Sequence, residues 1–204
     1  MPEAVLATFI GGLGGLVLGL AARLSQFCSL GAIEDAIYGN NFDRARMWGV
    51  AIGTSILLVH IAVLQNWVIP RESYHLSVQF NPLFTVFGGL LFGLGMALAG
   101  TCGFGALTRL GGGDLRSFMI VLVMGVTAYS VSSGPFSRAT SWMLTETAYR
   151  KETQSISDQI GIISGLSTPL IGCIIGLIFL VVSIWSKSFF SDKKRIFWSF
   201  SIGF

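Results

Sequence analysis

The sequence predicts an all-α integral membrane protein with about five transmembrane helices and two short re-entrant elements that arise from an internal repeat. Of its 204 residues, 52% are hydrophobic and only 11% are charged, whereas a typical soluble domain carries about 25% charged residues. Too little charge is therefore available to cover a water-soluble surface. A spanning helix needs about 20 apolar residues, and uncharged stretches of this order occur at residues 4–22, 47–69, 76–108, 117–137 and 159–186.

The first stretch is predicted to be a permanent span rather than a cleaved secretory signal. Glu3 precedes it where a signal carries Lys or Arg, and the apolar run is too long for a signal. The basic residues then favour one side of the membrane. Those after odd-numbered spans are Arg23, Arg44, Arg46, Arg109, Arg116, Lys187, Lys193, Lys194 and Arg195, against Arg71, Arg138, Arg150 and Lys151 after even-numbered ones. The positive-inside rule predicts an outside amino terminus and a cytoplasmic carboxyl terminus.

Two blocks of the sequence recur at a constant offset of 74 residues. Residues 14–20 match residues 88–94, and residues 28–33 match residues 102–107, with no insertion between the blocks. One register held over both blocks indicates a duplication of a glycine-rich span, a CxxGA element and a second span. We therefore expect a first membrane repeat over residues 1–71, a second over residues 72–154, and a fifth span with a basic tail over residues 155–204.

Glycines recur at every fourth position within the spans. The sets are Gly11, Gly15 and Gly19, then Gly89 and Gly93, Gly161 and Gly165, and Gly172 and Gly176. This spacing lets helix backbones approach closely in lipid, so we interpret these glycines as packing seams rather than ligand contacts.

Composition argues against several other classes of protein. The net charge of +3 suggests no nucleic-acid partner. Three cysteines without a CxxC spacing make a disulfide framework or a zinc site improbable. Residues 137–158 are polar with mixed charge and are predicted to form an extramembrane loop on the outside.

The third uncharged stretch is too long for one straight span. As a single helix, residues 76–108 would extend about 50 Å, against a hydrocarbon core of about 30 Å. Glycine-rich residues 99–108 favour a break, and residues 24–33 are their counterpart in the first repeat. Non-helical backbone at membrane depth must line protein or a water-filled cavity, and broken helices at mid-membrane build transporter sites.

Each predicted break carries a cysteine. If a short helix begins just after Cys28 and just after Cys102, its first N–H groups and positive dipole end form an anion site. An apolar pocket favours the neutral thiol, which offers a weak S–H donor to a soft, sulfur-containing anion. The alternative, that both cysteines are simply small apolar residues, stays open. The candidate path residues are Cys28, Ser29, Gly31, Thr101, Cys102, Gly103 and Gly105.

Other polar residues receive structural interpretations. Arg23 lies near the end of the first span, and since the second repeat has Ala97 there, an interfacial anchor is favoured over a substrate-attracting role. Glu34 and Asp35 are expected to be helix-dipole partners. His60 is expected to be a hydrogen-bonded packing residue. Cys173 has no repeat partner and is likewise assigned to packing.

Two motifs resemble the signature elements of the YeeE/YedE family of sulfur-compound transporters. They are Phe27-Cys28-Ser29-Leu30-Gly31-Ala32 followed by Glu34-Asp35, and Gly100-Thr101-Cys102-Gly103-Phe104-Gly105. The resemblance covers nearly the whole chain. It implies a bacterial inner-membrane transporter, not an enzyme, that takes up thiosulfate or a related species along a narrow path where Cys28 and Cys102 contact the anion. It implies no cofactor or metal, and it suggests a cytoplasmic sulfurtransferase as a partner.

The chain departs from that family in length. Full-length members carry a second half with a further path cysteine, and residues 193–204 look like the opening of that half. Cys173 does not match the missing cysteine, because no motif surrounds it. The expectation is a truncated product, one of two separately encoded halves, or a half that dimerises.

Three rival functions remain open at the level of sequence. A selenium compound could use the same thiols. A sulfur-transfer or redox component would turn its cysteines over covalently, but the sequence shows no base, resolving cysteine or basic cluster to activate a thiol. A non-transporting remnant or a membrane scaffold is the third.

Overall fold

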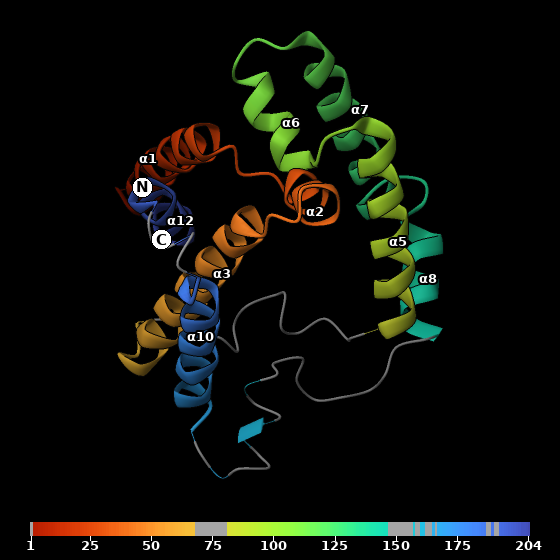
Figure 1. The fold of residues 1–204 in the computed structure, drawn as a ribbon. Coiled ribbons are helices and arrows are strands. Elements are labelled where there is room, and N and C mark those ends of the chain that lie inside the picture. Colours follow the sequence, from red (N-terminus) through yellow and green to blue (C-terminus); the bar gives the residue numbers. More distant parts are fainter. Residues whose placement is uncertain are drawn as a thin grey trace. The chain divides into compact units, whose positions relative to one another are not determined.

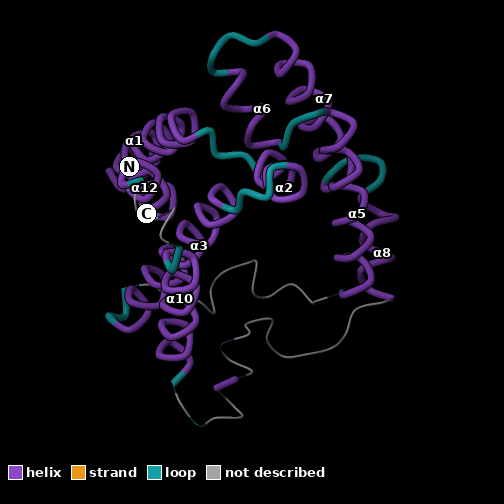
Figure 2. The backbone as a smooth tube through the Cα atoms, in the orientation of Figure 1, coloured by secondary structure: helices purple, strands orange, loops and turns teal. Residues whose placement is uncertain are grey.

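Helices make up every secondary-structure element of the described chain (Figures 1 and 2). The computed structural model describes residues 2–67, 81–146, 157, 160–161, 165, 167–186, 189 and 192–204. Four segments are long and apolar enough to cross a membrane, namely Val5–Tyr38, Asp43–Leu64, Thr85–Leu110 and Leu115–Ser132, and Thr168–Ile184 is a shorter apolar helix. Many of their large side chains are exposed, such as Leu90 at 67% and Leu98 at 80%. The expectation of an all-α membrane protein is confirmed.

The helices fall into two units, each described here by itself. The first unit comprises Met1–Leu58 and Ile175–Phe204, and the second comprises Val59–Ile174. The first contains α1 (Pro2–Ser25), α2 (Ser29–Tyr38), most of α3 (Asp43–Leu64), the end of α10 (Thr168–Ile184) and α12 (Lys193–Gly203). The second contains α5 (Pro82–Ala99), α6 (Gly103–Leu110), α7 (Leu115–Ser132) and α8 (Ser137–Glu146), with the end of α3 and the start of α10. The predicted repeat boundaries at residues 71 and 154 lie outside the described residues.

The backbone follows the sequence repeat closely. Helix α1 ends at Ser25 and α5 at Ala99, and the next residue in each case is left-handed, with φ 53° at Gln26 and 68° at Gly100. The short helices α2 and α6 then begin at Ser29 and Gly103. All of these paired positions are 74 residues apart. A left-handed residue is a common way to end a helix, so the two repeats break their first span by the same turn.

Helix α3 begins four residues before the uncharged stretch that predicted it. After α2, the N–H of Gly39 bonds to the carbonyl of Asp35, and Asn40 is left-handed with φ 48°. The Asn41 side chain then accepts the N–H of Asp43 at 2.9 Å. Polar residues thus end α2 and cap the start of α3. The first turn of α3 carries charged side chains, so a search for uncharged stretches places its start too late.

Glycine packing is confirmed where α3 crosses α10. A Cβ at Gly176 would lie 3.1 Å from the carbonyl oxygen of Gly53, and one at Gly53 would lie 3.0 Å from the carbonyl oxygen of Gly176. One turn further along, the His60 ring lies directly against Gly172. The two helices therefore approach closely at Gly53 and Gly176, where the absence of a side chain on either glycine brings each backbone near the other.

The predicted seams in α1 and α5 meet no close neighbour among the described residues of their own units. A Cβ at Gly11, Gly15 or Gly19 of α1 would meet nothing within 4 Å, and the same holds for Gly89 and Gly93 of α5. For these glycines the interpretation as packing seams stays a prediction.

Two further predictions need correction. Residues 137–146, expected in a loop, form α8, while residues 147–156 and 158 lie outside the described part. The apolar helix of the fifth span, expected from residue 159, is Thr168–Ile184; the described residues 160 and 161 are also helical, but 165 and 167 between them are not.

The basic tail folds as α12 and packs onto the first unit. Helices α1 and α12 lie side by side (Figure 1). Arg195 pairs with Asp43 at 3.1 Å and with Asp192 at 3.0 Å, and the Ser55 hydroxyl donates to the carbonyl of Gly203 at 2.7 Å. Helix α12 is thus anchored to α3 at its start, through Asp43, and at its end, through Ser55.

Candidate functional site

The first cysteine element lies in the first unit, at the start of α2. Cys28 is the N-cap residue, in an extended conformation with φ −146° and ψ 127°, and its carbonyl accepts the N–H of Ala32 at 3.0 Å. The Cys28 side chain makes no capping hydrogen bond. Ser29 and Gly31 belong to the first turn, whose N–H groups have no acceptor within the helix itself.

The second element lies in the second unit, at the start of α6. Cys102 is the N-cap residue, with φ −81° and ψ 161°, and its Sγ accepts the N–H of Gly105 at 3.2 Å. Cys102 is only 3% exposed, and the preceding Thr101 is 4% exposed. The Cys102 sulfur therefore already accepts one of the first-turn N–H groups that were predicted to bind an anion.

Both elements thus start a short helix immediately after the cysteine, which is the condition on which the predicted anion site depended. Each cysteine also precedes a helix of eight residues or more, with 10 residues in α2 and 8 in α6. Whether the seven candidate path residues contact an anion stays a prediction. The three cysteines are thiols in the structure.

A cavity of about 520 Å³ adjoins the second element. Thr101 and Gly103 line it together with residues of α5 and α7, among them the methionines Met96, Met119 and Met124. A Cβ at Gly103 would lie 2.9 Å from Sδ of Met124, so a larger residue here would require the flexible Met124 side chain to move. Cys102 itself is not among the lining residues, because its thiol turns back onto α6. The cavity offers a soft, apolar surface.

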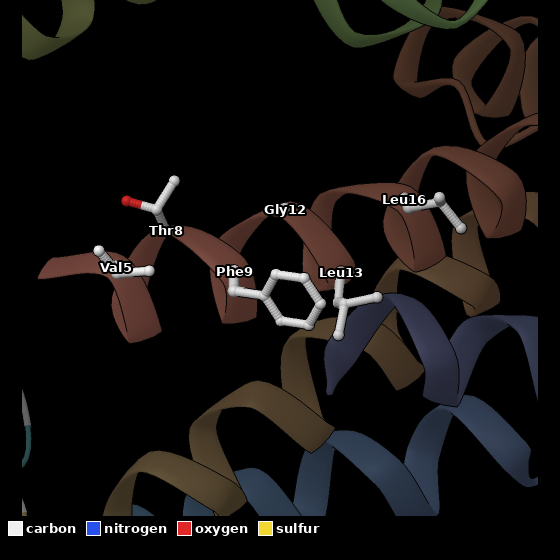
Figure 3. Close-up of a pocket in the computed structure, with 6 residues that line it drawn as sticks. All are labelled: Val5, Thr8, Phe9, Gly12, Leu13 and Leu16. Carbon is white, nitrogen blue, oxygen red and sulfur yellow. The ribbon is translucent and has the colours of Figure 1, made fainter. Parts of the chain in front are cut away.

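A second hollow, of about 530 Å³, lies along one face of α1 (Figure 3). Its lining residues are Val5, Thr8, Phe9, Gly12, Leu13 and Leu16, all from one helix. It contains none of the candidate path residues and is a groove between apolar side chains on an exposed helix face.

Helix α3 contributes residues that the sequence did not single out. Arg44 Nε lies 3.0 Å from Oδ2 of Asp35, and its Nη2 donates to Oε1 of Gln26 at 3.2 Å. One turn further on, the Trp48 ring stacks on Phe27 with centroids 4.2 Å apart. The Trp48 indole nitrogen is buried, and the described residues supply no acceptor for it. From the sequence, Arg44 entered only the comparison of basic residues on the two sides of the membrane, because nothing near it in the sequence links it to residues 26–35.

Metal binding finds no support in the part of the chain that the structure describes. No group of three or more His, Cys, Asp or Glu side chains is arranged there to hold an ion.

Comparison with known proteins gives consistent results. The sequence model of a family described as sulphur transport matches residues 24–201, which include both cysteine elements. A protein from Spirochaeta thermophila named thiosulfate transporter TsuA is 27% identical over 191 residues, covering 91% of this chain and 52% of that relative. A protein of the same name from Escherichia coli is 28% identical over 173 residues, covering 84% and 44%. The chain spans about half the length of these relatives.

Proposed function

The chain belongs to the sulphur transport family, and from this premise we propose that it is a membrane transporter for an inorganic sulfur anion, most specifically thiosulfate. The family match also confirms the resemblance to the YeeE/YedE family that the sequence motifs indicate. Thiosulfate is the substrate in the printed names of both relatives. For this chain it is a proposal.

The observation that carries the proposal is the paired placement of Cys28 and Cys102. Each occupies the N-cap of a short helix directly after a left-handed turn that ends a long apolar helix. A dianion entering an apolar region loses hydration worth many kcal/mol, so a path for it must supply donors. The first-turn N–H groups and the positive helix end supply them.

The thiols add selectivity for soft sulfur. A neutral S–H is a weak donor, and sulfur is polarisable, so it suits the terminal sulfur of thiosulfate better than a hard oxyanion. Passage in this scheme forms and breaks no covalent bond. The proposed role is therefore transport, with no catalytic residue and no cofactor.

The wider setting belongs to the same proposal. We place the chain in a bacterial inner membrane with its amino terminus outside, and we propose that a cytoplasmic sulfurtransferase uses the imported thiosulfate. Since the relatives are about twice as long, the proposal includes assembly with a second copy or with a second half-transporter chain.

Labelled thiosulfate uptake tests the proposal. Cells that lack other sulfate and thiosulfate importers would express the full chain, and unlabelled sulfate, thiosulfate or a selenium oxyanion would compete. We expect uptake that excess thiosulfate abolishes and that sulfate leaves nearly unchanged. Stronger competition by the selenium species would assign the path to selenium instead. If neither the chain in cells nor the purified chain in liposomes moves either anion, the proposal fails for the chain acting alone.

A further inference from the structure

We propose that Arg44 contacts the transported anion at the Cys28 element through its Nη1 group and so selects for negative charge there. This inference rests on the proposed function and deepens it. It assigns to α3 a substrate-binding residue of the first repeat that the cysteine motifs do not include.

The position of the guanidinium carries the first step. A Cβ added to Gly31 would lie 2.5 Å from Arg44 Nη1 and 3.8 Å from Cys28 Cβ. Arg44 and Cys28 therefore share the small space beside this buried glycine. A larger residue at position 31 would displace the guanidinium from this place.

Two anchors fix the orientation of the guanidinium. Asp35 holds Nε from within α2, and Gln26 holds Nη2 from the turn ahead of Cys28. Gln26 is left-handed with φ 53°, a conformation that costs a non-glycine residue about 1 kcal/mol. The second repeat has Gly100 at this place, so the amide that reaches Arg44 accounts for a side chain where glycine would fit more easily.

Nη1 is the nitrogen left over by these anchors. The contacts to Asp35 and Gln26 use Nε and Nη2, whereas arginine offers five N–H donors in a fixed fork. The side chain is 33% exposed, so an arriving anion can reach it. Guanidinium is also weakly hydrated and matches oxyanion geometry.

The second repeat lacks residues equivalent to Arg44 and Asp35. At the offset of 74 residues, Phe118 replaces Arg44 and Arg109 replaces Asp35, and the Cys102 element faces the thioether of Met124 instead. The two elements therefore differ in chemistry, with charge recognition at Cys28 and a soft, uncharged surface beside Cys102.

The rival explanation is that Arg44 and Asp35 form a purely structural ion pair. The effects of substituting Arg44 and Asp35 on anion binding distinguish the two explanations. If the pair only fastens α2 to α3, Arg44→Gln and Asp35→Asn each break it and have similar effects. If Nη1 contacts the anion, Arg44→Gln weakens binding, whereas Asp35→Asn keeps an acceptor for Nε and removes a competing negative charge.

The test measures protection of Cys28 by thiosulfate in the purified full chain in nanodiscs. Mass spectrometry follows alkylation of Cys28 by N-ethylmaleimide at increasing thiosulfate concentrations. We expect Arg44→Gln to raise the half-protecting concentration about tenfold, the scale of one lost charged hydrogen bond. Arg44→Lys should fall between, and Asp35→Asn should lower the concentration or leave it unchanged. Arg116→Gln removes the same charge from an exposed position in the second unit and is the control.

Two outcomes would overturn the assignment of Arg44. One is a shift for Arg44→Gln no larger than that for Arg116→Gln, and the other is an equal rise for Asp35→Asn. Uptake in cells is measured in parallel with the same variants. Uptake by the unmodified chain without protection of Cys28 rejects the Arg44 contact and leaves transport standing, whereas the absence of both uptake and protection rejects the proposed function as well.

Discussion

Cys28 and Cys102 occupy equivalent positions in the repeat, yet their side chains behave differently. The Sγ of Cys102 accepts the N–H of Gly105, whereas the Cys28 side chain makes no capping bond. The sequence predicts that a helix follows each cysteine, because glycine-rich segments break long apolar runs. It does not predict the direction of either thiol, and the two caps also differ in backbone conformation, with φ −81° at Cys102 and −146° at Cys28.

Substitution of Cys102 should separate capping from transport. Serine is a better N-cap than cysteine, so Cys102→Ser is expected to preserve the stability of α6, while Cys102→Ala should lose about 0.5–1 kcal/mol. Both should lose thiosulfate uptake, since neither retains a thiol. Thermal unfolding in detergent and uptake assays on the same variants check this. Wild-type uptake by Cys102→Ser would contradict a role for the thiol.

Asp114 provides a pH-dependent cap outside the spans. The hydrogen bond from the Ser117 hydroxyl, at 2.7 Å, is the main cause that lowers the pKa of this carboxyl, with the N–H of Arg116 adding to it. A lowered pKa in the folded state means that ionised Asp114 stabilises the start of α7 at neutral pH.

This contribution should be lost as pH falls through the lowered pKa, below the ordinary value of 3.8. The melting temperatures of the unmodified chain and of Asp114→Ala are therefore expected to differ at pH 7 and to converge toward pH 3. A difference that stays constant over this range would show that the carboxylate does not act through its charge.

At the scale of elements, the repeat predicted the breaks after α1 and α5, but charge patterns misplaced other boundaries. Helix α3 begins at Asp43 and includes Arg44 and Arg46 in its first turns, because polar capping and ion pairs extend a helix beyond its apolar stretch. The contacts of Arg44 with Gln26 and Asp35 were missed for a different reason. They join the turn after α1, the middle of α2 and the start of α3, and only the fold brings these residues together.

The crossing of α3 and α10 should tolerate no side chain. We expect Gly176→Ala to destabilise the chain by about 1–3 kcal/mol, because its Cβ would press on Leu57 and on the Gly53 carbonyl. Gly15→Ala, on an open face of α1, is the matched control and should change stability little. Thermal unfolding in detergent compares them. Equal effects would mean that α10 does not cross α3 as described.

At the scale of the whole molecule, the sequence predicted a helical membrane protein because its spans carry almost no charge. Each unit contains one cysteine element, with Cys28 in the first and Cys102 in the second. The predicted orientation in the membrane rests on the excess of basic residues after odd-numbered spans. Packing contacts within the chain give no information about it.

That orientation predicts the behaviour of reporter fusions. Green fluorescent protein joined after Phe204 should fluoresce, and alkaline phosphatase at the same place should be inactive, because both report a cytoplasmic carboxyl terminus. Phosphatase inserted at residue 150 should be active. The reverse pattern at either place would contradict the predicted orientation.

The most direct test of the central claim is thiosulfate uptake by Cys28→Ala, Cys102→Ala and Cys173→Ala at matched membrane expression, in cells without other importers. The proposed path predicts that the first two substitutions abolish uptake and that Cys173→Ala, a change away from both helix starts, retains it. Uptake that survives the loss of Cys28 and of Cys102 would show that the thiols are only small packing residues.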